Sequence, residues 1–273
     1  MTQYRPPLLN LPPVVKNLLI INVIMLLASM FLRSKFGVDL DQYLALYYPK
    51  SAFFQPYQLI THMFMHGGFS HLFFNMFALF MFGRVLESVW GPKRFLIYYL
   101  ATGLGAAALH TFVGWIDYSS MKSAADAFSN TPTPDLMLSF IRDHVGAVKP
   151  WVLDFVNSWS DNPGNSFQTQ KAIMMVNQMV IEHINIPTIG ASGAVFGILL
   201  AFGMLFPNTE LMLLFPPIPI KAKYFVVGYG VLELFMGVQN QTGDNVAHFA
   251  HLGGMLFGFI LIKYWQRNSK RFY

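Results

Sequence analysis

The chain has 273 residues, of which 54% are hydrophobic and only 11% are charged, and it contains no cysteine. Soluble domains carry about 25% charged residues, so this chain has too few charges to cover a water-facing surface of its size. A membrane protein is therefore indicated, and disulfides, thiolate catalysis and cysteine-based metal sites are excluded.

Six apolar segments approach the roughly 20 residues that a helix needs to span a bilayer. They cover approximately residues 17–33, 70–89, 94–115, 189–206, 222–240 and 246–265. The first lacks a following cleavage motif, so it is expected to remain as a membrane helix rather than to be removed as a signal peptide. We predict an all-α polytopic membrane protein, a six-helix bundle forming a single domain over residues 1–273.

The net charge of +5 is spread unevenly over the connecting segments. With the N-terminus in the cytoplasm, the cytoplasmic segments hold Arg5, Lys16, Arg84, Lys93, Arg94, Lys221, Lys223, Lys263, Arg267, Lys270 and Arg271. The short outer segments hold only Arg33, Lys35 and Lys50. This positive-inside pattern predicts that both termini are cytoplasmic, and the expected location is a bacterial inner membrane. Because topology accounts for the basic residues, the lipid bilayer is an expected partner and nucleic acid is not.

Residues 116–187 form a locally acidic stretch between the third and fourth apolar segments. Turn signals occur at residues 131–134 and 161–164. Apolar residues recur at near-helical spacing at Leu136, Phe140, Ile141, Val145, Trp151, Val152, Phe155, Trp159, Ile173, Val176, Val180 and Ile184. This pattern predicts an extramembrane insertion of short amphipathic helices. We favour an outer cap without chemistry; the alternative is an element that gates or recognises substrate.

The fourth apolar segment opens with a serine at its start. Ser192 follows Pro187-Thr188 and is expected in the first turns of the helix, near the outer surface. Gly193, Gly197 and Ala201 form a stripe of small residues that allows another helix to approach closely. The alternative is a serine that only assists packing. The G-x-S-x-G elbow of soluble hydrolases does not apply, because position 194 is alanine.

The sixth apolar segment carries two histidines. His251 is flanked on one helical face by Ala247, Gly254 and Gly258, so it is expected to project from a groove that receives the small-residue stripe of the fourth helix. An ionisable residue in a spanning helix is a functional hypothesis by default. We predict that Ser192 and His251 meet as nucleophile and base. His248, about 60° around the helix, is the rival base.

The second apolar segment and the loop before it carry a ladder of polar residues, namely His62, His66, His71 and Asn75. Gly67-Gly68 argues against one continuous helix, so the helix is expected to begin near Ser70 as a candidate N-cap. His71 and Asn75 then share a face and can donate hydrogen bonds to a developing oxyanion. For the two loop histidines a hydrogen-bond network is favoured over a metal site, since no acidic residue stands near them.

These pieces, in this order, resemble the rhomboid family of intramembrane serine proteases. The matching residues are the histidine–asparagine ladder, Gly83 with Glu87, the Gly190-x-Ser192-Gly193 turn, and His251 with Gly254 and Gly258. The resemblance covers nearly the whole chain except residues 116–187. It implies a Ser192–His251 dyad without an aspartate, and an oxyanion site at Gly190, the Ser192 N–H, His71 and Asn75.

The resemblance further implies that the aromatic residue four positions after the serine, here Phe196, packs on the histidine. Many family members carry tyrosine at this position, and Trp-Arg where this chain has Tyr57-Gln58. Neither a metal nor another cofactor is expected. The expected partners are membrane proteins with a helix-destabilised transmembrane segment. Two alternatives to a protease remain: a rhomboid-like pseudoprotease that binds membrane clients, and a proton-coupled transporter.

Overall fold

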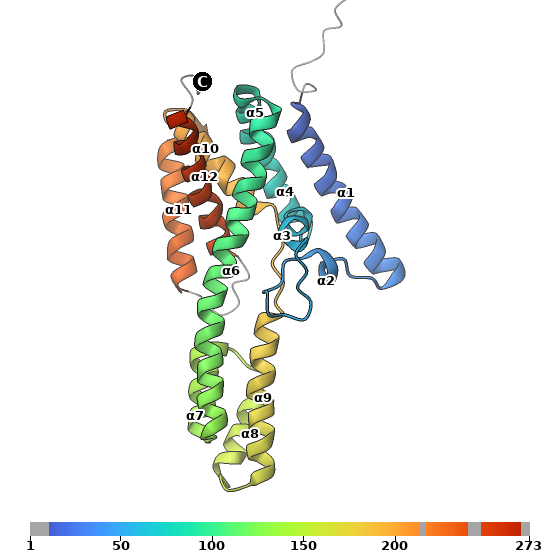
Figure 1. Ribbon diagram of the computed structural model, residues 1–273, viewed down its shortest axis with the longest axis vertical. Coiled ribbons are helices and arrows are strands. Elements are labelled where there is room, and N and C mark those ends of the chain that lie inside the picture. The colour runs from blue at the N-terminus through green and yellow to red at the C-terminus, as the bar shows by residue number, and fades with distance from the viewer. Residues whose placement is uncertain (1–10, 213–216, 240–246, 269–273) are drawn as a thin grey trace, which may run out of the picture.

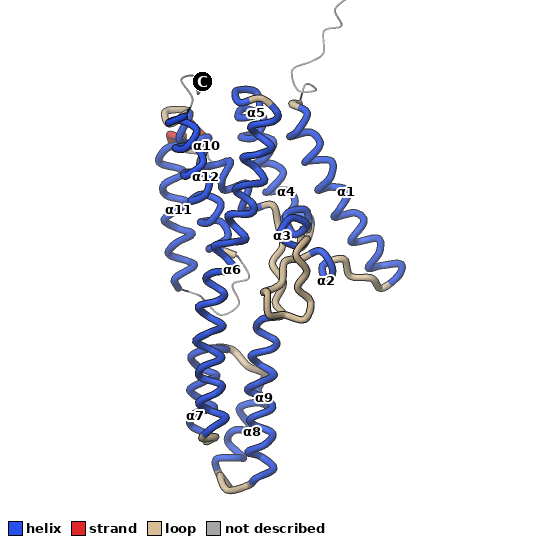
Figure 2. Tube along the Cα trace, viewed as in Figure 1, coloured by secondary structure: helices blue, strands red, loops and turns tan. Residues whose placement is uncertain are grey.

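The computed structural model describes residues 11–212, 217–239 and 247–268 (Figure 1). Arg5, Lys270 and Arg271, which contributed to the topology prediction, lie outside this part of the chain. The described structure consists mostly of helices joined by loops (Figure 2), with a short antiparallel hairpin formed by β1 (Glu210–Met212) and β2 (Pro219–Lys221).

Six helical runs correspond to the six predicted spans. They are α1 (Pro13–Phe36), the run α4 (Phe69–Ala78), η3 (Leu79–Gly83) and α5 (Arg84–Trp90), then α6 (Pro92–Asn130), α10 (Ser192–Leu205), α11 (Ala222–Gln239) and α12 (His248–Asn268). Within the described residues, three of them are long and apolar enough to cross a membrane by length and composition: α1, the run over residues 69–90, and α6. α10 is apolar but has only 14 residues. An all-α membrane bundle is thus confirmed, while the count of six spans stays a prediction.

Helix α6 differs most from its predicted span, residues 94–115. It has 39 residues, which at 1.5 Å per residue makes it about 58 Å long, well beyond a hydrocarbon core of about 30 Å. The polar residues after position 115 do not break the helix. Residues 116–130 therefore continue α6 into the insertion, and Figure 1 shows α6 running along most of the molecule.

The rest of the insertion folds back along the extension of α6. It consists of α7 (Pro134–Phe140), η4 (Ile141–Val145), α8 (Pro150–Ser160) and α9 (Ser166–Ile184). The apolar faces of these helices and of the α6 extension form a separate core, centred on Phe128, Met137, Val156, Trp159 and Val176. α9, with 19 residues, is longer than the short helices predicted. Trp151, one of the periodic apolar residues, is exposed.

The N-terminal end of α1 is held by a carboxylate from another helix. Pro12 cannot cap α1 with its side chain, so the first N–H groups of the helix need partners. Glu87, buried in α5, accepts from the Val14 N–H with Oε1 (2.9 Å) and from the Val15 N–H with Oε2 (2.7 Å). Gly83 lies beside this contact, where a side chain would press on Leu79, Phe95 and Val15.

The loop between α1 and α4 contains α2 (Asp41–Leu44), α3 (Gln58–Thr61) and the 3₁₀ turn η2 (His62–Phe64). The Gln58 side chain anchors this loop, because its Nε2 donates to the Tyr43 and Phe53 carbonyl oxygens at 3.2 and 2.9 Å. α4 begins at Phe69 with Gly68 as N-cap residue, so the prediction of Ser70 as the cap was wrong. The left-handed φ of 156° at Gly68 favours glycine there.

Candidate active site

Ser192 is the first residue of α10 and is half-buried. The segment before it is fixed from two sides. Thr188 pairs with Leu46 through two backbone hydrogen bonds, and the Thr188 hydroxyl contacts His110 Nε2 of α6 at 2.8 Å. The Gly190 N–H donates to the His62 carbonyl oxygen at 2.9 Å. The serine therefore stands on a turn held by the first loop and by α6.

His251 lies against Ser192 from α12. Its Nε2 is 2.8 Å from the Ser192 Oγ, and its ring stacks on Phe196 with centroids 4.1 Å apart and planes 7° from parallel. Phe196 lies one turn after Ser192 on the same helix, so α10 supplies both the hydroxyl and the surface on which the imidazole rests. The structure thus brings together the two residues predicted as nucleophile and base.

The other ring nitrogen of His251 contacts a carboxylate that was not among the predicted site residues. Glu233 Oε2 of α11 lies 2.9 Å from His251 Nδ1 and 2.6 Å from His248 Nδ1. All three side chains are at least nine-tenths buried. His248, the rival base, therefore directs its Nδ1 to Glu233, while the hydrogen bond from Ser192 goes to His251.

His71 of α4 lies beside the turn that carries the serine. A side chain at Gly190 would come within 2.9 Å of His71 Cε1 and Nε2, so the glycine leaves room for the imidazole, and its φ of 125° suits glycine as well. The Gly67 N–H donates to His71 Nδ1 at 3.4 Å. An accepting Nδ1 places the proton of the neutral ring on Nε2, the atom that faces Gly190.

Asn75 lies one turn further along α4 and is buried. Its Nδ2 donates to the His71 carbonyl oxygen at 3.0 Å, which leaves the second amide hydrogen for another acceptor. Of the loop histidines, His62 contacts the Gln58 carbonyl oxygen through Nδ1 at 2.8 Å, and burial lowers its pKa to about 4. His66 packs its ring edge against His71, with centroids 5.0 Å apart.

The predicted glycines allow three helices to meet. A side chain at Gly254 would overlap the Gly193 carbonyl group, so α12 and α10 touch through their backbones there. Gly258 instead faces Tyr98 of α6, whose hydroxyl donates to the Gly197 carbonyl oxygen at 2.8 Å. The small-residue stripe of α10 also packs on α6, where Gly193 meets Ala106 and Gly197 meets Thr102. The close contact expected between α12 and α10 is thus shown at Gly254, while the atoms nearest to a side chain at Gly258 belong to α6.

Among the residues that the structure describes, one group in the site could hold a metal ion. Glu233, His248 and His251 each offer a donor atom, and these atoms lie within 4.8 Å of one another. The carboxylate oxygen already accepts from both imidazoles, so hydrogen bonding accounts for the arrangement. The cavity beside Ser192, lined by His62, Gly190 and Ala250, has a volume of only about 10 Å³, roughly the space of one water.

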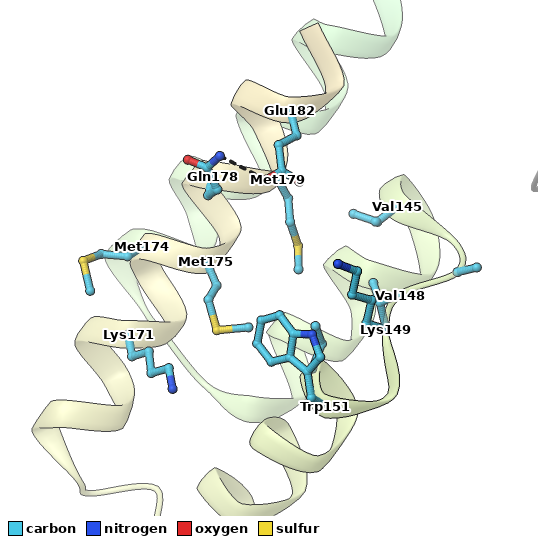
Figure 3. Close-up of a pocket in the computed structure, with 12 residues that line it drawn as sticks. Val145, Val148, Lys149, Trp151, Lys171, Met174, Met175, Gln178, Met179 and Glu182 are labelled. Atoms are coloured by element: carbon cyan, nitrogen blue, oxygen red, sulfur yellow. Dashed lines mark hydrogen bonds between the residues drawn. The ribbon is translucent and has the colours of Figure 1, made fainter. Parts of the chain in front are cut away.

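A larger groove of about 530 Å³ lies in the insertion, between η4, α8 and α9. Figure 3 shows the Trp151 ring and the methionine side chains Met175 and Met179 directed into it, with Lys149 and Lys171 at its sides. None of its lining residues belongs to the group around Ser192. The predicted site residues therefore gather at one end of the bundle, apart from this groove.

The site residue that sequence reasoning missed is Glu233. A carboxylate in an apolar span is itself a signal of function, and that signal was present in the sequence. The pairing with His251 could not be inferred locally, because the two residues belong to different helices and no short motif joins them.

Comparison with known proteins finds similarity over more than half of the chain. A sequence model of the Rhomboid domain matches residues 54–120 and 167–267. The match includes the loop histidines, α4, α10, Glu233 and α12, and it omits most of the insertion.

Two of the similar proteins carry mitochondrial names. The chain is 25% identical over 228 residues to an uncharacterized mitochondrial rhomboid protein of Schizosaccharomyces pombe, covering 77% of this chain and 52% of that protein. It is 26% identical over 242 residues to the mitochondrial RHOMBOID-like protein 12 of Arabidopsis thaliana, covering 88% and 52%. A 57-residue segment is 40% identical to the rhomboid protease GluP of Bacillus subtilis, covering 20% and 11%. The chain spans about half the length of the first two relatives.

Proposed function

This chain belongs to the rhomboid family, and from that premise we propose that it is an intramembrane serine endopeptidase. The observation that carries the proposal is the 2.8 Å contact between Ser192 Oγ and His251 Nε2 at one end of a membrane bundle. A nucleophile and a base within 2.6–3.2 Å of each other form the geometric signature of covalent catalysis.

The proposed reaction is hydrolysis of a peptide bond in two steps. Ser192 Oγ attacks the carbonyl carbon while His251 Nε2 takes the hydroxyl proton, and the carbonyl electrons move to the oxygen. The protonated His251 then gives that proton to the leaving amine. Water, activated by the same imidazole, hydrolyses the acyl-enzyme. The first-turn N–H groups of α10 lack intrahelical partners; together with His71 and Asn75 they form the proposed oxyanion site.

The alternatives explain less of the geometry. A pseudoprotease that binds membrane clients has no need of a hydrogen-bonded serine and histidine. A proton-coupled transporter has no need of a serine at the start of a helix, with His71 beside the turn and Phe196 under the histidine. The protease proposal uses all four groups.

The proposed substrates are single-span membrane proteins. An intact helix shields its backbone, and unwinding it in lipid exposes polar groups that cost several kcal/mol each unless protein or water satisfies them. Helices with Gly, Pro or small polar residues near one end unwind most readily. We expect cleavage at or just outside the outer end of the spanning helix, after a small residue.

The proposed location is a bacterial inner membrane, with both termini cytoplasmic and the active site open to the opposite face. The positive-inside distribution supports this orientation; the mitochondrial names of two relatives make an organelle membrane the competing location. Because the chain has no cysteine, single cysteines introduced at Gln168 in the insertion and at Thr209 beside β1 can be labelled from one side. We expect an impermeant maleimide to label intact cells only at position 168; labelling only at position 209 would reverse the orientation.

The test of the activity is cleavage in proteoliposomes. Purified protein is incubated with a panel of single-span substrates, Ser192→Ala serves as the control, and the cuts are mapped by mass spectrometry. We expect cuts near the outer helix end that disappear in the control. Cuts confined to cytoplasmic segments, or cuts that persist in Ser192→Ala, would overturn the proposal.

A further inference from the structure

We propose that Glu233 is a positioning residue of this site, so that the dyad becomes a Ser192–His251–Glu233 triad. The inference rests on the proposed function and adds a residue to it. The carboxylate does not touch the substrate; it acts through His251, whose Nδ1 lies 2.9 Å from Glu233 Oε2.

Two glycines allow the carboxylate to reach the histidines. Gly230 and Gly237 lie three residues before and four after Glu233, on the same face of α11. A side chain at Gly230 would come within 3.1 Å of Met255, and one at Gly237 within 3.1 Å of His248 Cβ. Both neighbours belong to α12, so α11 approaches α12 closely on either side of Glu233.

The contact with Glu233 determines the tautomer of His251. An ionised carboxylate can only accept hydrogen bonds, so His251 Nδ1 must carry a proton and donate it to Oε2. In the neutral imidazole Nε2 then bears the lone pair, and at 2.8 Å it can accept the Ser192 hydroxyl proton. Once Nε2 has taken that proton, the ring is positive and lies beside a negative carboxylate. The carboxylate therefore both selects the competent tautomer and stabilises the charged ring, as the buried acid does in soluble serine proteases.

His248 has a supporting part in this arrangement. Its Nδ1 lies 2.6 Å from the same Oε2 atom, so the carboxylate has two donors in an environment where an unpaired charge would be costly. His248 therefore holds Glu233, and Glu233 orients His251. This explains why the second histidine is present although it is not the base.

A second buried glutamate provides a matched control. Glu87 is as buried as Glu233, with exposed fractions of 2% and 6%, and also binds two N–H donors through its carboxylate. Its donors are the Val14 and Val15 amides of α1 rather than imidazoles. The same Glu→Gln change at the two positions therefore separates an effect on the histidines from the general cost of neutralising a buried carboxylate.

The experiment measures kcat, KM and thermal stability of the 273-residue protein in proteoliposomes, for the wild type and for Glu233→Gln, Glu233→Asp, Glu87→Gln and Ser192→Ala. Glu233→Gln should lower kcat by about 10²–10⁴-fold, because replacing the buried acid of a triad by an amide costs up to about 10⁴-fold. KM should change by less than about threefold. Glu87→Gln should lower thermal stability and leave kcat within about threefold of the wild type.

The aspartate variant separates a role of the carboxylate from a role of side-chain size. Glutamine matches glutamate in volume but not in charge, whereas aspartate keeps the charge on a shorter side chain. A positioning role predicts higher kcat for Glu233→Asp than for Glu233→Gln. The opposite order, or wild-type kcat in Glu233→Gln while Ser192→Ala is inactive, would overturn the role of Glu233 alone. Equal cleavage by wild type and Ser192→Ala would instead overturn the proposed function.

Discussion

The helix bundle and the helical insertion are both built around apolar cores, but they differ in what else is buried. In the described part of the chain, the buried polar and charged residues are Asn22, Ser29, Ser51, Gln58, His62, His66, Asn75, Glu87, Thr102, Glu233, His248 and His251. All of them belong to the bundle and its first loop. The insertion core, around Phe128 and Trp159, consists of apolar side chains.

This difference indicates that the chemistry belongs to the bundle and not to the insertion. Burying a polar group costs free energy unless it is hydrogen-bonded, so a protein with no use for such groups would fill the bundle with apolar residues, as it does the insertion. The bundle instead places Ser192, His251, Glu233 and His71 around one turn, with large apolar side chains such as Phe73 and Phe74 exposed on its outside. Substitutions around Ser192 should therefore lower activity with little loss of stability. Substitutions in the insertion core should lower local stability with little loss of activity.

The largest expected effect is at the dyad. Ser192→Ala or His251→Ala should lower kcat by roughly 10⁴–10⁶-fold while the protein still inserts and folds, and the double variant should be no worse than either single one, because members of a catalytic unit are not additive. Proteoliposome kinetics measure this. His248→Ala is the control and should retain more activity than His251→Ala; the reverse order would make His248 the base.

Asn75 tests the proposed oxyanion site within the same region. Asn75→Ala should lower kcat by roughly 10²–10³-fold, the usual cost of losing one preorganised donor, with little change in the binding of uncleaved substrate. Asn22→Ala is a matched control, because buried Asn22 makes the same kind of helix hydrogen bond, from Nδ2 to the Leu18 carbonyl oxygen at 2.8 Å. A normal rate in Asn75→Ala would remove Asn75 from the mechanism.

Gly254 tests whether close approach of α12 and α10 is needed. Gly254→Val would force a side chain into the Gly193 carbonyl group and push the two helices apart, and misplacing reacting groups by about 1 Å can cost 10²-fold in rate. Gly228→Val on α11 is the control, since nothing lies within 4 Å of a side chain there. We expect activity to fall before the fold is lost. Wild-type turnover in Gly254→Val would show that the close approach is unnecessary.

The smallest expected effect on activity is in the insertion core. Trp159 is fully buried, so Trp159→Ala should destabilise the insertion by about 3–5 kcal/mol, measured as faster limited proteolysis within residues 116–187. Trp151→Ala, at an exposed tryptophan, is the control. If the insertion is a cap, cleavage of a good substrate stays within about threefold of the wild type in both variants. A change in which substrates are cut would favour the gating interpretation.

The sequence predicts the bundle better than it predicts the contacts inside it. The length of the apolar segments locates all six helical runs, because the bilayer demands long apolar segments. It misplaces the end of α6, since the residues after position 115 are polar yet compatible with a helix, and it cannot foresee the π-helical turn over Leu79–Gly83.

The site residues also divide into contacts that the sequence predicts and contacts that it does not. Ser192 and His251 stand beside small residues that mark close helix contacts, so their meeting could be predicted from spacing alone. The relation of Glu233 to His251, and the packing of His71 against Gly190, depend on how separate helices and loops are arranged in space. Local sequence does not encode that arrangement.

The central claim, that His251 activates Ser192, is tested most directly by labelling with a serine-directed fluorophosphonate. The protein is labelled in proteoliposomes, the modified residue is identified by mass spectrometry, and the rate is compared among wild type, His251→Ala and Glu233→Gln. We predict an adduct on Ser192 that is at least about 10²-fold slower to form without His251 and intermediate without the Glu233 carboxylate. An unlabelled Ser192, or a labelling rate that does not depend on His251, would contradict the claim.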